Sequence, residues 1–389
     1  MLHIDFLRFC LDQQRELPAS ASGIDWNEML VWAERQAIVG IILGGITDAR
    51  CQNEDGKSRL QIPYEVLMRW IGYANLIENR NKLLNKRCVE VGEYFKTKGF
   101  ESCILKGQGN AMMYPNPLLR TPGDIDVWVM PDERLRVNGS RLNVKEVIQL
   151  AREKNPNGKA CYHHVDYGYF KEVEMEVHYR PTFMNNLIAN RRLQQWMKAH
   201  EDEQFSHKIT LPGQEKSISV PTWEFNVVFQ LSHIYRHVIQ RGVGLRQMID
   251  YYFLLKSGNN NQVNGSKLMV HGSWLMVNGS TENMKETLKY LSLYKFAGAV
   301  MWVLKEVLGL EDQYLIVPVN ERRGRFLYDE MMRGGNFGQY SADSRKPKGR
   351  IDQNIDRLKQ DLRLVRYFPS ECLWEPVFRA WHFFWRLAV

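Results

Sequence analysis

The spacing of the apolar residues changes twice along this chain of 389 residues. From about Tyr64 to Phe95, apolar residues recur at helical spacing among many charges, with no proline. Between about residues 100 and 180, short runs alternate apolar and polar residues, which is typical of half-buried strands. From about residue 221 the helical pattern returns. The sequence therefore predicts an α+β fold in which a small mixed β-sheet core is flanked by N-terminal and C-terminal helical regions.

The length of the chain supports the same division, because 389 residues exceed one ordinary core at about 150 residues per domain. We expect an N-terminal helical region at 1–97, an α/β domain at 98–220 and a C-terminal helical domain at 221–389. Related Val-Asn-Gly-Ser sequences recur in segments at about 135–144 and 258–283, which we interpret as inserted surface loops. Repeats of this length are too short to be solenoid units.

Composition excludes several classes of protein. The chain is 44% hydrophobic and 25% charged, as in ordinary globular proteins, and its net charge of +8 is compatible with a phosphate-bearing partner. Six cysteines without a CxxC pair argue against a disulfide framework. The chain does not open with a secretory signal, and the apolar stretch from Ala37 to Ile46 is too short to span a bilayer. We therefore expect a cytoplasmic protein without stable membrane insertion.

A pair of carboxylates marks the start of one predicted strand. Asp124 and Asp126 follow Gly123 in a segment that alternates polar and apolar residues. On a strand, this spacing places both carboxylates on one face, with Ile125 and Val127 on the other. Two such carboxylates repel each other unless a cation lies between them, and Mg²⁺ prefers oxygen ligands that it shares with substrate phosphates. The pair predicts a metal site, with a solvated strand edge as the alternative.

A second alternating run offers a third carboxylate. Glu174, Glu176 and His178 share one face of the strand predicted at about residues 173–179. If this strand pairs beside the first, three carboxylates meet, and such a set can hold two metal ions about 4 Å apart. Glu176 is the expected third ligand, although Glu174 can substitute for it. We interpret His178 as a supporting or packing residue rather than a ligand.

The segment Lys106–Gly109 stands where a short apolar strand gives way to a helix. Glycines at such a turn let backbone N–H groups approach phosphate oxygens. Lys106 and Arg120 add positive charge for a phosphate chain, with ordinary surface positions as the alternative. The segment therefore predicts a phosphate-binding turn next to the carboxylates.

Histidines suggest two further metal sites, and both have a simpler explanation. Cys161 and His163 share one strand face, but no second pair follows at the spacing of zinc ligands. His233 and His237 are four residues apart on a predicted helix. We favour strand packing for the first pair and a helix face that lines the cleft for the second.

Together these motifs resemble the bacterial nucleotidyltransferases of the polymerase-β superfamily. In that superfamily a Gly-Gly or Gly-Ser turn precedes an Asp-x-Asp strand, and a third Asp or Glu lies on a later strand. The similarity is carried by Leu105-Lys106-Gly107, Tyr114-Pro115, Arg120–Val127 and Glu176-Val177-His178, and it continues in Leu231–His237 and Leu245–Asp250.

The resemblance implies roles for individual residues. Asp124, Asp126 and Glu176 take the positions of the catalytic, metal-binding carboxylates, and Gly107 takes that of the first turn glycine. The expected nucleotide-binding residues are Lys106, Gly107, Gln108, Arg120 and Gly123. The chain departs from the pattern in two places, since Gln108 replaces the usual Ser and seventeen positions separate Gly107 from Asp124.

The activity implied is transfer of a nucleoside monophosphate from an NTP such as ATP to an acceptor, by a two-metal mechanism that uses Mg²⁺ or Mn²⁺. The motifs leave the acceptor open among a small molecule, a sugar, RNA and protein, and they do not indicate an oligomeric state. Two alternatives share the same motifs. One is a catalytically inactive, nucleotide-binding regulatory protein, and the other is a toxin-type nucleotidyltransferase that acts on RNA or protein.

Overall fold

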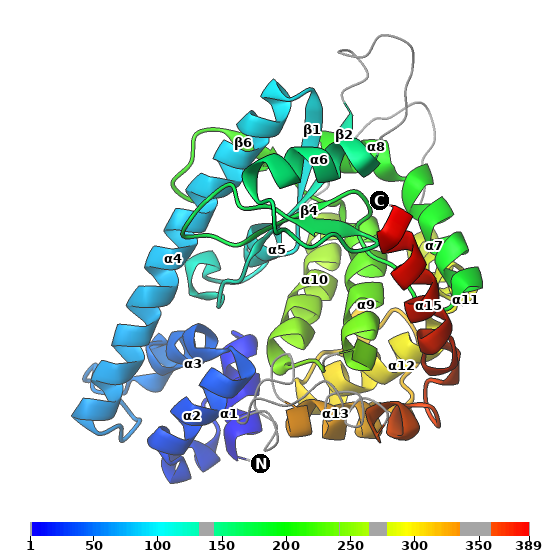
Figure 1. Cartoon of the computed structure of the whole chain (residues 1–389). Coiled ribbons are helices and arrows are strands. Elements are labelled where there is room, and N and C mark those ends of the chain that lie inside the picture. The colour runs from blue at the N-terminus through cyan, green and yellow to red at the C-terminus, as the bar shows by residue number, and fades with distance from the viewer. Residues whose placement is uncertain (1, 132–143, 241, 264–277, 335–358, 389) are drawn as a thin grey trace.

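The computed structural model describes residues 2–131, 144–240, 242–263, 278–334 and 359–388. In this part of the chain a single mixed sheet lies among helices that precede and follow it (Figure 1). The α-helices are α1 (Leu2–Leu11), α2 (Trp26–Gln36), α3 (Val39–Ile46), α4 (Tyr64–Thr97), α5 (Gly107–Ala111), α6 (Val144–Lys154), α7 (Leu187–Ala199), α8 (Glu201–Ser206), α9 (Trp223–Gln240), α10 (Leu245–Val263), α11 (Asn278–Tyr290), α12 (Tyr294–Trp302), α13 (Glu321–Gly334) and α15 (Pro369–Ala388).

Within the described residues the sheet has six strands in the order β3-β4-β2-β1-β6-β5. The strands are β1 (Phe100–Leu105), β2 (Ile125–Pro131), β3 (His164–Asp166), β4 (Met175–His178), β5 (Lys208–Thr210) and β6 (Ser217–Ser219). β2 is antiparallel to β1 and parallel to β4, while β1 is parallel to β6. The predicted α+β fold, a small mixed sheet flanked by helical regions, is confirmed.

The predicted strand pair at 161–170 and 173–179 is present but shorter than expected. β3 and β4 are antiparallel neighbours, with Val165 opposite Val177. Beyond this pairing the chain leaves the sheet, and the rings of Tyr167 and Tyr169 pack against Tyr94 of α4. Aromatic packing across the end of the sheet replaces the outer residues of the predicted ladder.

Helix α4 joins the N-terminal helices to the sheet. It begins after Pro63 and ends before Gly99, whose φ of 77° is left-handed. Its first half packs against α3, whereas Val91 and Phe95 in its second half lie in the core beneath the sheet. The boundary expected at residue 97 therefore falls at the end of a helix that already belongs to the sheet (Figure 1).

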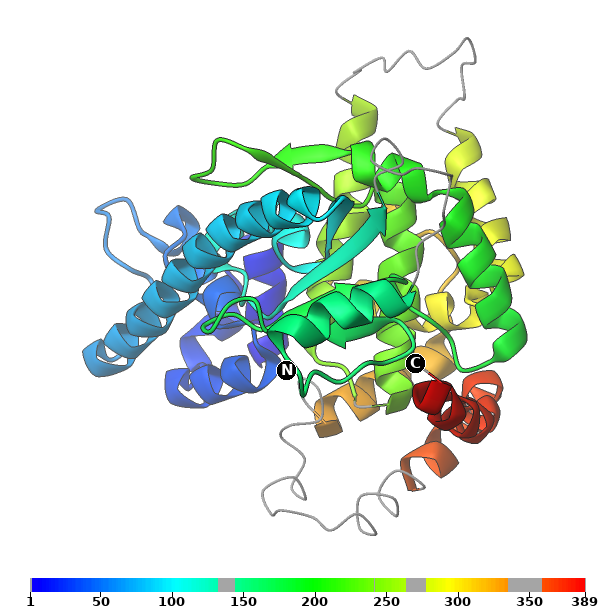
Figure 2. The ribbon, with the colours of Figure 1, turned by 45° about the horizontal axis from the view of Figure 1, so that its top comes forward.

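The two faces of the sheet have different partners. Ile125 and Val127 of β2 pack with α4 and α6, and these helices cover that face (Figure 2). Trp128 points to the other face and stacks on Phe225 of α9, with ring centroids 5.6 Å apart. Because side chains alternate along a strand, Asp126 shares the face of Trp128 and is directed toward the C-terminal helices.

Two expectations for the C-terminal part need correction. The helical pattern expected after residue 221 is interrupted between α11 and α12, because Ser292 adopts a left-handed φ of 62° that turns the chain between the buried Leu291 and Leu293. The loop expected at 258–283 is helical up to Val263 and again from Asn278. Residues 264–277, and 135–143 of the other expected insertion, lie outside the described residues. None of the described helices combines the length and apolar character needed to cross a bilayer.

The long connection between β1 and β2 is held against the N-terminal helices. It contains α5 and a 3-10 turn, Pro117–Leu119. The carbonyl of Leu119 lies so close to Gly40 of α3 that a Cβ on Gly40 would stand 2.0 Å from the oxygen. Gly44, on the same helix, would place its Cβ 3.9 Å from the Leu119 side chain, which is ordinary contact. The seventeen-residue spacing is therefore accommodated by a docked segment.

Gly40→Ala should lower the free energy of unfolding by about 2–3 kcal/mol, because the added methyl group meets a backbone oxygen that cannot move without shifting the connection. Gly44→Ala is the matched control, and it should be neutral or stabilise the protein by about 0.5–1 kcal/mol because alanine is the better helix former. Urea unfolding of both variants measures the difference. Equal stability of the two variants would contradict the close contact at Gly40.

Helix α15 is anchored to the loop that precedes α7 by one buried carboxylate. Glu371 accepts hydrogen bonds from the backbone N–H groups of Asn185, at 2.6 Å, and Asn186, at 3.3 Å. Burial raises the pKa of Glu371 from 4.5 to about 7, although both hydrogen bonds act in the opposite direction. The folded protein therefore holds this proton at a pH where an unfolded chain releases it.

We expect this group to make stability depend on pH. Because the pKa of Glu371 is raised in the folded state, the protonated carboxyl contributes fully to the free energy of unfolding below about pH 4.5. This contribution, about 3 kcal/mol at most, is lost as the pH rises to about 7. Glu371→Gln should flatten the curve of unfolding free energy against pH between 5 and 8. Glu65→Gln, the same change at an exposed position, is the control and should leave the pH dependence of the unfolding free energy as it is. If Glu371→Gln also leaves that pH dependence unchanged, the Glu371 carboxyl is not its cause.

Candidate active site

The pairing of two strands brings the second and third predicted carboxylates together. β2 and β4 run parallel in a register that sets Asp126 beside Glu176 and Trp128 beside His178. Asp126 is 3% exposed and lies on the face directed toward α9. The strand pairing expected from the sequence is therefore present, and it depends on the alternation that buries Ile125 and Val127 behind the site.

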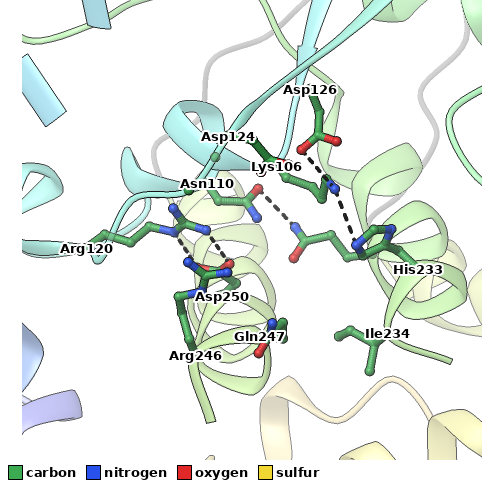
Figure 3. Close-up of a pocket in the computed structure, with 13 residues that line it drawn as sticks. Lys106, Asn110, Arg120, Asp124, Asp126, His233, Ile234, Arg246, Gln247 and Asp250 are labelled. Carbon is green, nitrogen blue, oxygen red and sulfur yellow. Dashed lines mark hydrogen bonds and ion pairs between the residues drawn. The ribbon is translucent and has the colours of Figure 1, made fainter. Parts of the chain in front are cut away.

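The turn after β1 delivers a positive charge to this pair. Leu105, the last residue of β1, is opposite Asp126, and Lys106 follows with a left-handed φ of 52° that is unusual for a residue with a side chain. Its ammonium lies 2.9 Å from Oδ2 of Asp126 and 3.3 Å from Nε2 of His233 (Figure 3). The strained turn thus aims the side chain at the carboxylate.

Histidines of the neighbouring strands contact the other carboxylate oxygens. Nε2 of His178 lies 2.9 Å from Oδ1 of Asp126 and 3.4 Å from Oε2 of Glu176. Nδ1 of His164, on β3, lies 2.8 Å from the same Glu176 oxygen. Asp126, Glu176 and His178 offer ligand atoms that all lie within 4.8 Å of one another, and such a set can hold a metal ion.

The charges at the site influence one another strongly. The charge of Asp126 and then burial raise the pKa of Asp124 to about 6, although Asp124 still opens to solvent at the mouth of the cleft. Burial alone would raise the pKa of Asp126, but Lys106 and His178 outweigh it and hold the pKa below its usual value. A divalent cation would relieve the repulsion that keeps Asp124 partly protonated.

Glu176 and His178 form an ionised pair. Burial opposes the charged form of both, but the two histidines hold the pKa of Glu176 below its usual value. Contacts with Asp126 and Glu176 raise the pKa of His178 against the effect of burial. The carboxylates on β2 and β4 are therefore available as anionic ligands.

A cleft opens beside these residues, between the sheet and helices α9 and α10. Gly123 lies against Arg246, so that a Cβ there would meet the guanidinium at 3.7 Å. The lining residues are Lys106, Gly107, Asn110, Arg120, Gly123, Asp124, Asp126, Gln230, His233, Ile234, Arg246, Gln247 and Asp250.

One wall of the cleft is a buried ion pair. Arg120 donates to both oxygens of Asp250, each at 2.7 Å (Figure 3). Tyr114 also donates to Oδ1, at 2.6 Å. Burial would raise the pKa of Asp250, but Arg120 holds it below its usual value. Arg246 donates to the carbonyls of Thr121 and Pro122 and points into the same cleft.

The structure distributes the predicted site residues unevenly. Those that line the cleft are Lys106, Gly107, Arg120, Gly123, Asp124 and Asp126. Glu176 lies beside Asp126 but outside the lining. Gln108 does not reach the cleft, because it is buried on the opposite side of α5, where it donates to Asn85 of α4. The sequence prediction that Gln108 contacts the nucleotide therefore has no support in this geometry.

His233, which was expected on a helix face that lines the cleft, is in the lining, but two polar residues of the same helix, Gln230 in the lining and Asn226 next to it, were not predicted. Gln230 of α9 donates to the side chain of Asn110 at 3.1 Å, and Asn226 donates to the same oxygen at 3.3 Å. Asn226, Gln230 and His233 follow one another at helical spacing in a segment that is otherwise strongly apolar. That polar stripe on a buried helix is the signal that could have identified them.

Comparison with known families identifies the chain. A family described as uncharacterised nucleotidyltransferase matches residues 22–271, more than half of the sequence and every residue that lines the cleft. The chain belongs to this family. Among solved structures, it is similar to an antigenic nucleotidyltransferase-like protein from Paracoccidioides brasiliensis, with 13% identity and a TM-score of 0.30 over 54% of this chain and 92% of that one. No curated relative matches.

The buried ion pair of this nucleotidyltransferase should be sensitive to loss of one partner. Asp250→Asn leaves Arg120 without its counter-charge in a buried position, and we expect a loss of about 3–5 kcal/mol in unfolding free energy. Replacing both partners, by Arg120→Met with Asp250→Leu, should recover most of that loss.

The exposed pair Glu321 and Arg325 on α13, 2.8 Å apart, is the matched control, and Glu321→Gln there should cost less than about 1 kcal/mol. Denaturant unfolding compares the variants. A small effect of Asp250→Asn, similar to that of the control, would show that the pair contributes nothing specific to the cleft wall.

Proposed function

We propose that this protein transfers a nucleoside monophosphate from an NTP to an acceptor, at a polymerase-β type site with Asp124, Asp126 and Glu176 as ligands of Mg²⁺ or Mn²⁺. The observation that carries the proposal is the in-register pairing of Asp126 with Glu176, beside a cleft lined by the cations of Lys106 and Arg246. Membership of the nucleotidyltransferase family supports it. The motif order supports a place among bacterial members of the polymerase-β superfamily.

The residues at this position suit a divalent cation. Oxygen ligands are what Mg²⁺ and Mn²⁺ prefer, and the carboxylate of Asp126 already draws one cation, the ammonium of Lys106, to its Oδ2. When bound, two divalent ions supply activation of the attacking hydroxyl and charge stabilisation of the leaving pyrophosphate. In the proposed assignment Asp124 and Asp126 bind both ions, and Glu176 binds the one near the acceptor.

The remaining groups act on the triphosphate. With a metal ion held at Asp126, the ammonium of Lys106 would be available to pair with phosphate oxygens of the NTP. Arg246 provides a second cation from α10. Arg120 is tied to Asp250, so its part in this proposal is to fix the backbone that carries Gly123, rather than to bind phosphate itself.

A nucleotide-binding protein without turnover is the second candidate. Its supporting observation is that both oxygens of Asp126 already have partners, Lys106 on Oδ2 and His178 on Oδ1. Those contacts neutralise the carboxylate without a metal ion. Cations in the cleft would still attract the phosphates of a nucleotide.

Nucleotide binding can be tested by the thermal shift of the full chain with each of the four NTPs, with and without Mg²⁺. A ligand present at 100 times its Kd should stabilise the protein by about 2.7 kcal/mol. The Mg²⁺-dependent rise in Tm should disappear in Asp124→Asn and in Glu176→Gln. It should persist in Glu174→Gln, which removes an exposed carboxyl just before β4 and decides between the two candidate ligands.

Pyrophosphate release with the stabilising NTP then separates transfer from binding alone. Release that depends on Asp124 supports the transferase. A shift without release in the presence of RNA, protein and sugar acceptors favours the second candidate, and the absence of any shift contradicts both.

A further inference from the structure

We infer that His178 is itself a ligand of the cation held between Asp126 and Glu176, and that this position therefore selects Mn²⁺ over Mg²⁺. The inference rests on the proposed function for the presence of a cation at these carboxylates. It adds a nitrogen ligand to a site whose expected ligands are all oxygen.

The surroundings of His178 fix which ring nitrogen can bind a metal ion. Nδ1 lies 3.3 Å from the backbone carbonyl of Arg180, and a carbonyl only accepts, so Nδ1 carries the proton in the neutral ring. In the metal-free protein Nε2 also carries a proton and donates toward Asp126 and Glu176, so a cation bound there would take the place of that proton while Nδ1 keeps its hydrogen bond to the carbonyl. A hydrogen bond from the second nitrogen to a carbonyl is the usual support of a metal-binding histidine. The ring is 1% exposed, so packing holds it in this orientation.

The distances at the site match those between ligand atoms on a shared cation. Nε2 of His178 is 2.9 Å from Oδ1 of Asp126 and 3.4 Å from Oε2 of Glu176. Atoms bound at about 2.1 Å from a cation stand about 3.0 Å apart on an octahedron and about 3.4 Å apart on a tetrahedron. Both distances from Nε2 are therefore compatible with ligands that share one ion, and the three ligand atoms all lie within 4.8 Å of one another.

The two oxygens of Asp126 have separate surroundings. Oδ1 faces the imidazole of His178, whereas Oδ2 faces Lys106 on the cleft side. A cation beside Oδ1 thus leaves the ammonium of Lys106 in place. Only an ion on the cleft side, shared with Asp124, has to displace it, so the two positions differ in both ligand chemistry and access.

His164 is better suited to positioning Glu176 than to metal binding. Its Nδ1 lies 2.8 Å from Oε2 of Glu176, on the side away from Asp126. His163 is further disfavoured as a ligand, because the guanidinium of Arg236 contacts its ring and would repel a cation. The favoured set is therefore two carboxylates and one imidazole.

This ligand set determines the metal preference. Imidazole nitrogen suits first-row transition metals, while Mg²⁺ is held by oxygen and retains its waters. Mn²⁺ accepts both kinds of ligand, and it also replaces Mg²⁺ at phosphate-bearing sites. The inferred Mn²⁺ position adjoins an oxygen-only position between Asp124 and Asp126, which suits Mg²⁺ carried by the NTP.

Pulsed EPR of the full chain loaded with Mn²⁺ tests the assignment directly, because a coordinated imidazole gives a ¹⁴N hyperfine coupling that changes when the histidines are labelled with ¹⁵N. We expect this coupling in the unmodified protein, in His164→Gln and in His207→Gln, a change at an exposed histidine far from the site. We expect it to be absent in His178→Gln. Mn²⁺ affinity, measured from the free-ion EPR signal, should fall at least about tenfold in His178→Gln.

Competition with Mg²⁺ provides the second measurement and needs no variant. Mn²⁺ should bind the unmodified protein at least about tenfold more tightly than Mg²⁺, because an imidazole ligand suits a transition metal better than it suits Mg²⁺, which keeps oxygen ligands and waters. Mn²⁺ binding that is lost in Asp126→Asn but shows no nitrogen coupling would overturn the inference and leave the proposed function intact. A coupling that disappears in His164→Gln instead would overturn the assignment to His178. Failure to bind either ion, with or without NTP, would contradict the proposed function and this inference together.

Discussion

The buried carboxylate of Asp126 is the constraint on which the rest of the site depends. An uncompensated charge in this position would cost several kcal/mol, so the fold must bring positive groups to it. It does so from two separate elements, since the turn after β1 supplies Lys106 and β4 supplies His178. His233 of α9, whose pKa burial holds well below its usual value, contacts the ammonium of Lys106 as a neutral ring. The sheet order can be understood as the arrangement that meets this requirement.

The need to neutralise buried charges also explains why so many ionisable groups lie close together at this site. Each partner of Asp126 is itself buried and needs a further partner. His178 contacts Glu176, and Glu176 contacts His164 on the edge strand. The result is a row of contacts across three strands, in which the charges of Asp126, His178 and Glu176 alternate and His164, whose pKa is lowered by burial, stands at the end. Such a row can exchange one of its positive members for a metal ion with little movement of the backbone, because the anionic positions are already set.

Local patterns were sufficient to predict the carboxylates and most of the fold. The alternation around Asp126 fixed its strand and its face, and the second alternating run identified Glu176 correctly as its neighbour. Contacts between distant parts of the chain could not be predicted in this way. Arg120 and Asp250 are separated by 130 residues, and nothing in either local sequence indicates that they form an ion pair. The burial of Gln108 away from the cleft could not be predicted for the same reason, since its partner lies on α4.

Helix α4 belongs both to the N-terminal helices and to the core of the sheet, and this limits which fragments of the chain can fold alone. Its second half forms part of the floor beneath the sheet, and the segment ending at Leu119 is docked on α3. A fragment limited to residues 98–220 would expose a broad apolar surface and would be expected to aggregate. The family match begins at residue 22, ahead of these helices, and ends within the region that follows α10. The smallest piece that can be passed between genomes as a working unit is therefore the sheet together with the helices on both sides of it.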